Sequence, residues 1–480
     1  MEATLSGRLF CTGISDHCLY KNVSLTKMKS KIMDKRRKQA FVFAGSTLLV
    51  GLLMWGAVYV DSLLPIATGY SAKYLCSATF ISNREQNDVE KLDLKFFPIK
   101  YVSNTVNFKD SSVTSLLLWR KSTAIFRKGI GSTLDRGKIR PFKFENRWNR
   151  KMEYQCWPLG DRFLDSTVAN SNVKLESIAN QLVNKGAYGG TCFAFLVVHK
   201  GIPVAEAYRK GITSKTRLLG WSMAKSFTNA IVGVLVKDRR VNIFKPVDFS
   251  EWKNDDRRTI TPNDLLRMQS GLMWNEDYGN RSDVTQMLYC NASVSRFVKN
   301  KPLEFAVGKH WEYSSGSTNL VCDWARSHFE SDEVFYDYVY HNLFNKIGMQ
   351  DAIIEPDGDG LFIGSSYIYA TARDYARFAL LYMQDGIFNG ERILPAGWVQ
   401  YTRTATRGSN GSYGAGFWLN GTSEVNQLPS DMFSCEGHDG QRIYMIPSKQ
   451  LVVVILGYSP TSTNRMRFED LMKDVVSSVK

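Results

Sequence analysis

The sequence predicts a mixed α/β (α+β) fold, in which strands near both ends of residues 166–480 form an antiparallel sheet surrounded by helices. Two observations support this class. Two pairs of strand-like runs each flank a short turn, and the residues between the pairs are typical of helices and loops. The runs are Cys192–His199, Ile202–Tyr208, Gln441–Ile446 and Gln450–Gly457.

Turn residues join the two runs of each pair. Lys200-Gly201 between the first two is typical of a two-residue hairpin turn, and Pro447-Ser448-Lys449 separates the second two. Both pairs are therefore predicted to be hairpins.

Helices between the hairpins are marked by capping chemistry, which predicts an all-helical lobe. Thr261 precedes a proline and is followed three residues on by Asp264, and Thr371 has the same relation to Asp374. A further helical pattern covers Val173 to Asn184, ahead of the first hairpin.

A charge-free run at residues 39–60 predicts a transmembrane helix. At about 1.5 Å per residue it extends roughly 33 Å, enough for a hydrocarbon core of about 30 Å. Seven Lys/Arg and one acid occupy residues 27–38, which places the N-terminus in the cytoplasm. We expect a single-pass protein of the bacterial inner membrane with a periplasmic catalytic domain. A cleaved signal peptide beginning at Met33 and a buried core helix are the alternatives.

The positive charge of the chain is confined to two stretches. The formal net charge is +15; residues 1–60 carry nine Lys/Arg against three acids, and residues 119–152 carry eleven against two. The rest of the chain is neutral by this count, so no basic groove for nucleic acid is expected. We expect a lipid bilayer as the partner of residues 39–60 and no nucleic-acid partner.

Four segments follow from these patterns: a basic tail at 1–38, an anchor at 39–60, an accessory segment at 61–165 and a main domain at 166–480. The eight cysteines show no metal-binding spacing, so neither a metal nor a cofactor is expected. Cys76 and Cys156 both lie in the exported part, where an oxidising compartment permits a disulfide between them.

Residues of the kinds used in catalysis occur in three separate segments of the sequence. Ser222 and Lys225 are three residues apart at the start of an apolar helical pattern, which puts both on one helix face. Ser-x-x-Lys alone has little value, because it recurs at Ser24, Ser171 and Ser477. At Ser222, however, two further elements follow in order: Tyr313-Ser314-Ser315-Gly316 in a polar loop, and His438-Asp439-Gly440 before a predicted strand.

This ordered trio resembles the class C β-lactamase and penicillin-binding esterase family, whose pattern is Ser-x-x-Lys, then Tyr-x-Asn or Tyr-Ser, then Lys-Thr-Gly or His-x-Gly. The likeness covers roughly residues 170–480 and includes residues 260–272, 343–349, 370–374 and 437–441. It is greatest to esterases and amidases similar to 6-aminohexanoate-dimer hydrolase. The resemblance implies a β-lactamase/transpeptidase-like fold.

The resemblance also implies a serine hydrolase that forms an acyl-enzyme with an ester, amide or peptide-like substrate. Ser222 is the implied nucleophile, and Lys225 and Tyr313 the pair that handles its proton. The backbone N–H groups of Ser222 and Gln441 are the implied oxyanion hole, and Gly440 is expected to let substrate approach closely.

Two departures from the family pattern bear on the substrate. Ser315 stands in place of an asparagine and His438 in place of a lysine, and both are expected to contact substrate. A neutral imidazole holds a carboxylate less firmly than an ammonium does. An ester or amide without an obligatory carboxylate is therefore favoured over a β-lactam. The alternative function is a penicillin or cell-wall ligand sensor that is acylated without efficient turnover.

Overall fold

The computed structural model describes residues 16–137, 139–146, 154–163, 172–421, 427–460 and 464–479. Contacts divide the chain into two units, Met1–Leu63 and Leu64–Lys480. The predicted boundary between residues 165 and 166 lies outside the described residues.

Strands from both ends of residues 191–458 form one six-stranded antiparallel sheet, as predicted, in the order β12-β13-β14-β15-β5-β6. The two predicted hairpins are β5–β6 and β14–β15, and they meet where β15 pairs with β5. The strands are β5 (Thr191–His199), β6 (Ile202–Tyr208), β12 (Trp418–Leu419), β13 (Phe433–Gly437), β14 (Gln441–Ile446) and β15 (Leu451–Tyr458).

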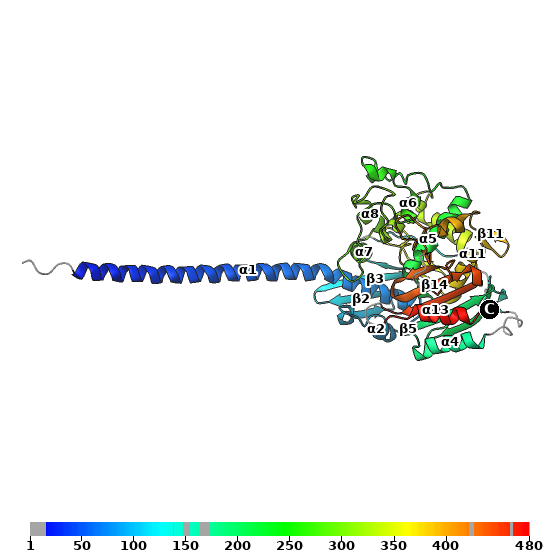
Figure 1. The fold of residues 1–480 in the computed structure, drawn as a ribbon, viewed down its shortest axis with the longest axis horizontal. Coiled ribbons are helices and arrows are strands. Elements are labelled where there is room, and N and C mark those ends of the chain that lie inside the picture. Colours follow the sequence, from blue (N-terminus) through cyan, green and yellow to red (C-terminus); the bar gives the residue numbers. More distant parts are fainter. Residues whose placement is uncertain are drawn as a thin grey trace, which may run out of the picture. The chain divides into compact units, whose positions relative to one another are not determined.

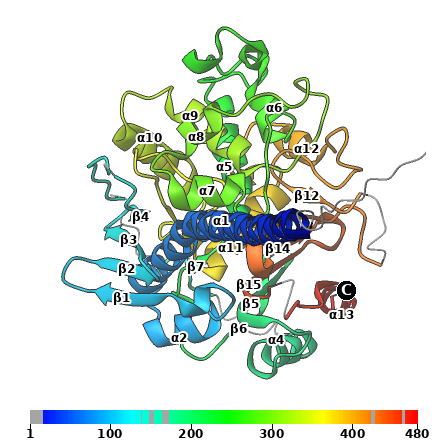
Figure 2. The same ribbon diagram turned by 90° about the vertical axis from the view of Figure 1, so that its left-hand side faces the viewer.

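Alternating side chains bury both faces of this sheet. In β5, Phe195 and Val197 point to one face, where helices α4 (Val173–Lys185) and α13 (Phe468–Ser477) pack. Figures 1 and 2 show these two helices together beside β5. Ala194, Leu196 and Val198 point to the other face, toward α5 (Ala224–Lys237) and α11 (Ala372–Met383). The sheet is thus the middle layer of the larger unit.

Residues between the hairpins form the helical lobe. The capping boxes at Thr261–Asp264 and Thr371–Asp374 are both present. The other helices and short strands are α6 (Pro262–Leu266), α7 (Asp283–Cys290), α8 (Val294–Lys299), α9 (Ser315–Arg326), α10 (Asp332–Val339), α12 (Trp398–Arg403), β7 (Leu218–Leu219), β8 (Ile353–Ile354), β9 (Ile368–Ala370), β10 (Ile387–Phe388) and β11 (Glu391–Arg392). Strands β7, β9 and β8 form a small sheet that leads into α5.

The segment ahead of α4 is more regular than its sequence indicated. It contains the short helix α2 (Gln86–Leu92) and a four-stranded antiparallel sheet. Its strands are β1 (Ser103–Asn107), β2 (Ser112–Leu117), β3 (Arg120–Arg127) and β4 (Gly131–Leu134). These strands have few large apolar side chains, so their sequence pattern is only weakly typical of strands.

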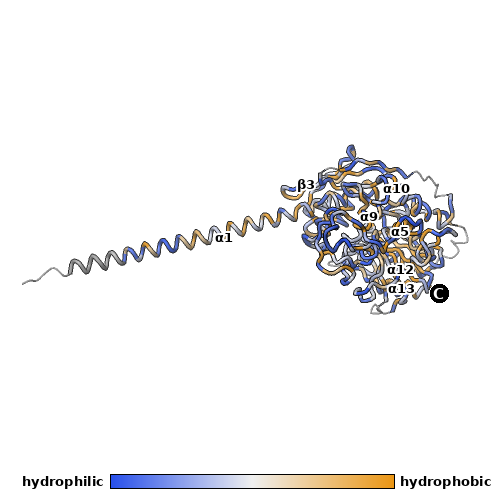
Figure 3. Tube along the Cα trace, turned by 90° about the horizontal axis from the view of Figure 1, so that it is seen from above, coloured by the Kyte–Doolittle hydropathy of each residue, from blue (hydrophilic) through white to orange (hydrophobic). Residues whose placement is uncertain are grey.

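Helix α1 (Asp16–Phe80) contains the apolar run at residues 39–60. Within the described residues, it is the one helix with the length and composition to cross a membrane. Figure 3 shows its hydrophilic stretch followed by a more hydrophobic one. The helix continues past the apolar run, and its residues from Leu64 onward belong to the larger unit.

A buried ion pair ties the end of α1 to the rest of the larger unit. Lys73 Nζ lies 2.6 Å from Glu355 Oε2, and both residues are at most 2% exposed. Ser77 Oγ donates to the other carboxylate oxygen at 2.8 Å, and the Ser132 backbone N–H of β4 donates to the same oxygen. Each charge therefore has partners that compensate for its removal from water.

The proposed disulfide between Cys76 and Cys156 is wrong for this structure, in which both are free thiols. Cys76 is fully buried in α1, and its sulfur accepts a hydrogen bond from Ser132 Oγ at 3.2 Å. Cys156 is exposed and forms an isolated β-bridge with Arg162. Burial of one thiol in an apolar interface keeps it from an exposed partner.

Replacing Lys73 by methionine is expected to lower the free energy of unfolding by about 3 to 5 kcal/mol, because Glu355 stays buried without its cation. Urea unfolding of the detergent-solubilised full chain, followed by circular dichroism, measures the change. The double variant Lys73→Met/Glu355→Leu should recover most of the loss. Lys473→Ala, which breaks the exposed pair with Glu469, is the control and should change stability by less than about 1 kcal/mol. A Lys73→Met variant as stable as this control would contradict the assignment.

Candidate active site

Ser222 lies where a short strand turns into a helix. β7 ends at Leu219, Gly220 hydrogen-bonds to the carbonyl of Ile368 in β9 at 2.8 Å, and the single turn Trp221–Met223 leads into α5. The partial positive charge at the start of this helix favours negative charge near Ser222. The strand fixes one end of the turn and the buried helix fixes the other.

Lys225 is buried one turn after Ser222 and has three acceptors around its amine. Its Nζ donates to Ser222 Oγ at 3.0 Å, to Ser315 Oγ at 2.9 Å and to the Ser365 carbonyl oxygen at 3.0 Å. The residue is only 2% exposed. Burial lowers the pKa of Lys225 to about 8, although the negative charge of Glu276 acts in the opposite direction. A buried amine with this pKa is partly neutral near physiological pH.

Tyr313 lies beside the lysine, in the loop before α9. Lys225 Nζ is 4.7 Å from the centre of its ring. Burial and the neighbouring Tyr413 and Glu276 raise the pKa of Tyr313 well above its usual value, while a hydrogen bond with Ser222 lowers it. The structure therefore brings Ser222, Lys225 and Tyr313 together, although they are distant in sequence.

Ser315 has a different position from the substrate contact that we predicted. It is completely buried, and its hydroxyl lies between Lys225 and Glu276. Its Oγ–H is donated to Glu276 Oε1, and its backbone N–H donates to Glu276 Oε2 at 2.9 Å. Ser315 thus lies behind the lysine, where it links Nζ to a carboxylate.

Glu276 is the residue of this site that the sequence did not reveal. Trp274 Nε1 donates to its Oε2 at 2.6 Å, which adds to the two bonds from Ser315 and fixes the carboxylate. It belongs to a loop in which Asn275 and Asp277 are similarly polar, so no periodicity or motif distinguishes it. Only the folded position reveals its effect on Lys225.

The turn His438–Gly440 joins β13 to β14. It lies beside residues 220–223, which contain Ser222 and are called the serine turn below. Gly437, at the end of β13, lies so close to the serine turn that a Cβ there would be 2.2 Å from the Gly220 carbonyl oxygen. The ring of His438 stacks on Tyr278 at 4.7 Å and meets the edge of Trp221 at 5.4 Å, and its side chain is 35% exposed. The hairpin and the serine turn are therefore in direct contact.

The structure gives Gly440 a different explanation from the close substrate approach that we expected. Its φ is +89°, and a Cβ there would be 2.8 Å from Ser459 Cβ and 3.0 Å from Phe468. Glycine is therefore required by the turn and by packing behind it. Gln441 is buried, and its side chain exchanges hydrogen bonds with Gly457 on β15, at 2.6 and 3.0 Å.

Arg442 holds the same turn from the first residues of β14. Its Nη1 donates to the carbonyl oxygens of Gly437 at 3.1 Å and Gln441 at 2.9 Å, and its Nη2 pairs with Glu436 at 3.2 Å. These bonds use the two terminal nitrogens of the guanidinium. Arg442 therefore braces the turn, with both terminal nitrogens bound to the protein itself.

Comparisons with known proteins agree with this architecture. The Beta-lactamase family model matches residues 175–472. The 6-aminohexanoate-dimer hydrolase of Paenarthrobacter ureafaciens is 25% identical in an alignment 332 residues long, which covers 62% of this chain and 81% of that protein.

Solved structures show the same fold. A putative 6-aminohexanoate-dimer hydrolase from Bacillus anthracis superposes with a TM-score of 0.52 at 23% identity and covers 59% of this chain and 79% of its own. A family VIII carboxylesterase also gives 0.52, at 14% identity, and covers 64% and 96% of the two chains. Because the family model covers more than half of the sequence, this chain belongs to the Beta-lactamase family and is a serine hydrolase.

Proposed function

We propose that this protein hydrolyses an ester or amide bond through an acyl-enzyme formed on Ser222. The observation that carries the proposal is the buried Lys225 amine, 3.0 Å from the Ser222 hydroxyl, with a pKa lowered to about 8. A serine hydroxyl becomes a good nucleophile only when a neighbouring base takes its proton. Lys225 in its neutral form is that base.

The hydrogen-bond partners of Lys225 support proton transfer from Ser222 to the lysine amine. A neutral amine has one lone pair, which needs a donor. The Ser365 carbonyl cannot donate, and the Ser315 hydroxyl already donates to Glu276. Ser222 is then the one partner of the three that can transfer a proton to Nζ.

Tyr313 completes proton handling in this proposal. Its pKa is raised well above its usual value, so its hydroxyl stays protonated and can donate to the leaving alkoxide or amine. As Tyr313 gives that proton to the leaving oxygen or nitrogen, it takes up the proton that Lys225 received from Ser222, so both residues return to their starting state. The C–O or C–N bond breaks, and the carbonyl carbon remains bonded to Ser222 Oγ. Water then attacks the acyl carbon and gives a proton to the Lys225–Tyr313 pair, which passes it to Ser222 Oγ as the acyl bond breaks and the acid leaves.

We propose the backbone N–H groups of Ser222 and Gln441 as the oxyanion hole, as the family resemblance implies. The contact between Gly437 and Gly220 supports this, because it brings the β13–β14 hairpin against the serine turn. The bonds from Arg442 and Gln441 to this hairpin support its rigidity. A rigid donor pair loses no energy to reorganisation during the reaction.

We propose a substrate that has no obligatory carboxylate. His438 stands in place of a family lysine, its ring is occupied by contacts with Tyr278 and Trp221, and Arg442 is bound to backbone oxygens and Glu436. The relatives named as 6-aminohexanoate-dimer hydrolase and carboxylesterase support amide and ester bonds. A small-molecule ester, amide or peptide-like compound fits these features.

The proposed location is a bacterial inner membrane, with residues 39–60 as a single span and the catalytic unit on the periplasmic side. The apolar run in α1 and the basic residues before it support this orientation.

Ser222→Ala is expected to abolish labelling by a fluorophosphonate and turnover of short-chain aryl esters, because the acyl-accepting oxygen is removed. In-gel fluorescence and ester absorbance measure the two signals on the full chain in detergent. Ser477→Ala, at an exposed Ser-x-x-Lys site, is the matched control and should retain both. Equal labelling of Ser222→Ala and wild type would show that Ser222 is not the nucleophile. Labelling without turnover in the wild type would instead favour the ligand sensor.

The rate of fluorophosphonate labelling is expected to rise with pH through about 8, as Lys225 loses its proton. Glu276→Gln should move this rise to lower pH, because the carboxylate raises the pKa of Lys225 and its removal lowers it. Labelling rates between pH 6 and 10 measure the shift. Glu251→Gln, whose carboxylate pairs with Lys299, is the control. An unchanged profile in Glu276→Gln would contradict the electrostatic coupling.

A further inference from the structure

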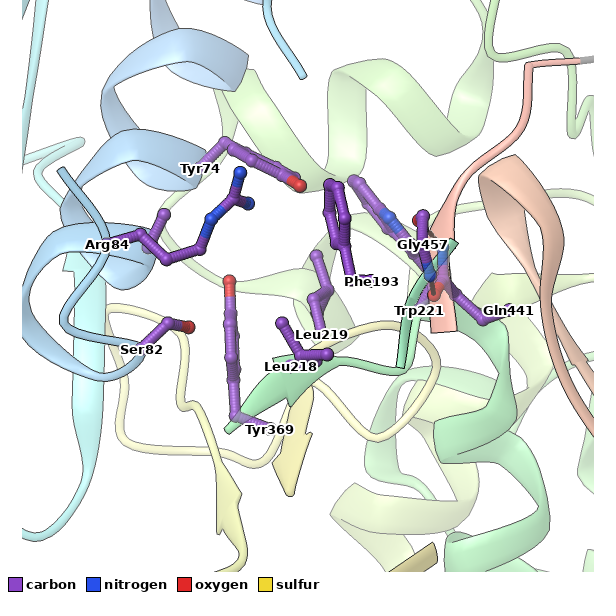
Figure 4. A pocket seen from close by; sticks show the side chains of 11 residues that line it. Tyr74, Ser82, Arg84, Phe193, Leu218, Leu219, Trp221, Tyr369, Gln441 and Gly457 are labelled. Carbon is purple, nitrogen blue, oxygen red and sulfur yellow. Dashed lines mark hydrogen bonds between the residues drawn. The ribbon is translucent and has the colours of Figure 1, made fainter. Parts of the chain in front are cut away.

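The end of α1 contacts the residue that precedes the proposed nucleophile. Tyr70 stacks on Trp221 with ring centres 6.0 Å apart and planes 20° apart, and Tyr74 stacks on it at 6.2 Å and 28°. Figure 4 shows Tyr74 of α1 and Trp221 lining the same cavity, which measures about 20 Å³. These tyrosines lie about a hundred residues before the start of the matched family region.

We propose that Tyr70 and Tyr74 are positioning residues, which hold Trp221 and through it Ser222 in the reactive geometry. The helix that follows the apolar run is then part of the catalytic apparatus. This inference rests on the proposed role of Ser222 and adds a segment that the family resemblance does not include.

Trp221 needs such support because its backbone is strained. Its φ is +49°, a left-handed conformation that bulky residues rarely adopt and that costs of order 1 kcal/mol or more. Conformations of this kind persist only where the surrounding packing imposes them. Trp221 is 2% exposed, so its ring cannot turn without displacing its neighbours. Relaxation of its backbone would rotate the peptide bond that joins it to Ser222.

Aromatic side chains surround the indole from several elements. Tyr70 and Tyr74 contact it from α1, Tyr278 from the loop that contains Glu276, Tyr367 from the loop before β9, and His438 from the hairpin turn. Tyr70 and Tyr74 stack nearly parallel to the indole ring, whereas Tyr278 and His438 meet it edge-on. Loss of the stacked pair would open a gap over the face of the indole.

Polar contacts hold the α1 tyrosines in register. Tyr70, Lys73, Tyr74 and Ser77 share one face of the helix by their spacing, and Lys73 and Ser77 bind the buried Glu355. The Tyr74 hydroxyl donates to Asp93 Oδ1 at 2.6 Å, and Asp93 in turn pairs with Arg84 at 2.7 Å. These contacts hold the end of α1 in place, so its tyrosines can in turn hold Trp221 in place.

The test compares leucine and phenylalanine variants of Tyr70 and Tyr74 in the full chain. Tyr70→Leu and Tyr74→Leu each remove a stacked ring and should lower kcat for aryl esters by at least about 10-fold, with a smaller change in KM, because Ser222 is misplaced. Tyr70→Phe keeps the ring and should rescue kcat, whereas Tyr74→Phe keeps the ring but loses the bond to Asp93 and should rescue most of it. Tyr336→Leu, a buried tyrosine that packs on Phe142 and Phe362, is the control for simple loss of core packing.

Hydrogen exchange gives a readout that needs no activity. The peptide spanning residues 219–226 should exchange faster in the two leucine variants than in wild type or Tyr336→Leu. The proposal is overturned if the leucine variants keep wild-type kcat and exchange, or if Tyr336→Leu reproduces both changes. A failure of the proposed function is distinguishable, since Ser222→Ala would then retain labelling whatever the state of Tyr70 and Tyr74.

Discussion

The desolvation of Lys225 is the constraint on which the proposed chemistry depends. An exposed lysine is a cation at neutral pH and cannot accept a proton, whereas burial makes its neutral form accessible. The fold achieves this by placing Nζ between α5, α9 and the Ser365 carbonyl. Glu276 limits the effect, since its charge favours the ammonium, and it acts across Ser315 rather than by direct contact with Nζ. The resulting pKa of about 8 reflects the balance between burial and this carboxylate.

The same residues show how a small polar network orients a base. Three acceptors satisfy the ammonium, but only Ser222 has a hydrogen that is free to return to the neutral amine. Replacement of the usual asparagine by Ser315 matters here, because a hydroxyl can accept from Lys225 and donate to Glu276 at once. This network of common side chains thus supports proton transfer from Ser222 to Lys225.

Much of the fold could be predicted because its signals are local. Hairpin turns, alternating strands and the capping boxes at Thr261 and Thr371 each depend on a few adjacent residues, and the structure reproduces them. The ordered trio at Ser222, Tyr313 and His438 likewise indicated the family. Glu276 and the buried position of Ser315 could not be predicted, because they arise from contacts between distant loops. The short strands β12, at the sheet edge, and β13, next to it, and the accessory sheet were missed because their apolar patterns are weak.

The buried contacts at the end of α1 bear on how this protein can be divided. Residues 175–472 match a family model and suggest a module that could be transplanted alone. In this chain such an excision would leave Glu355 without Lys73 and the indole of Trp221 without two stacked rings. The boundary of the inherited family and the boundary of the self-sufficient folding unit are therefore different. A fragment trimmed to the matched region would therefore expose buried surface around Glu355 and Trp221 that residues 64–80 help to cover in this structure.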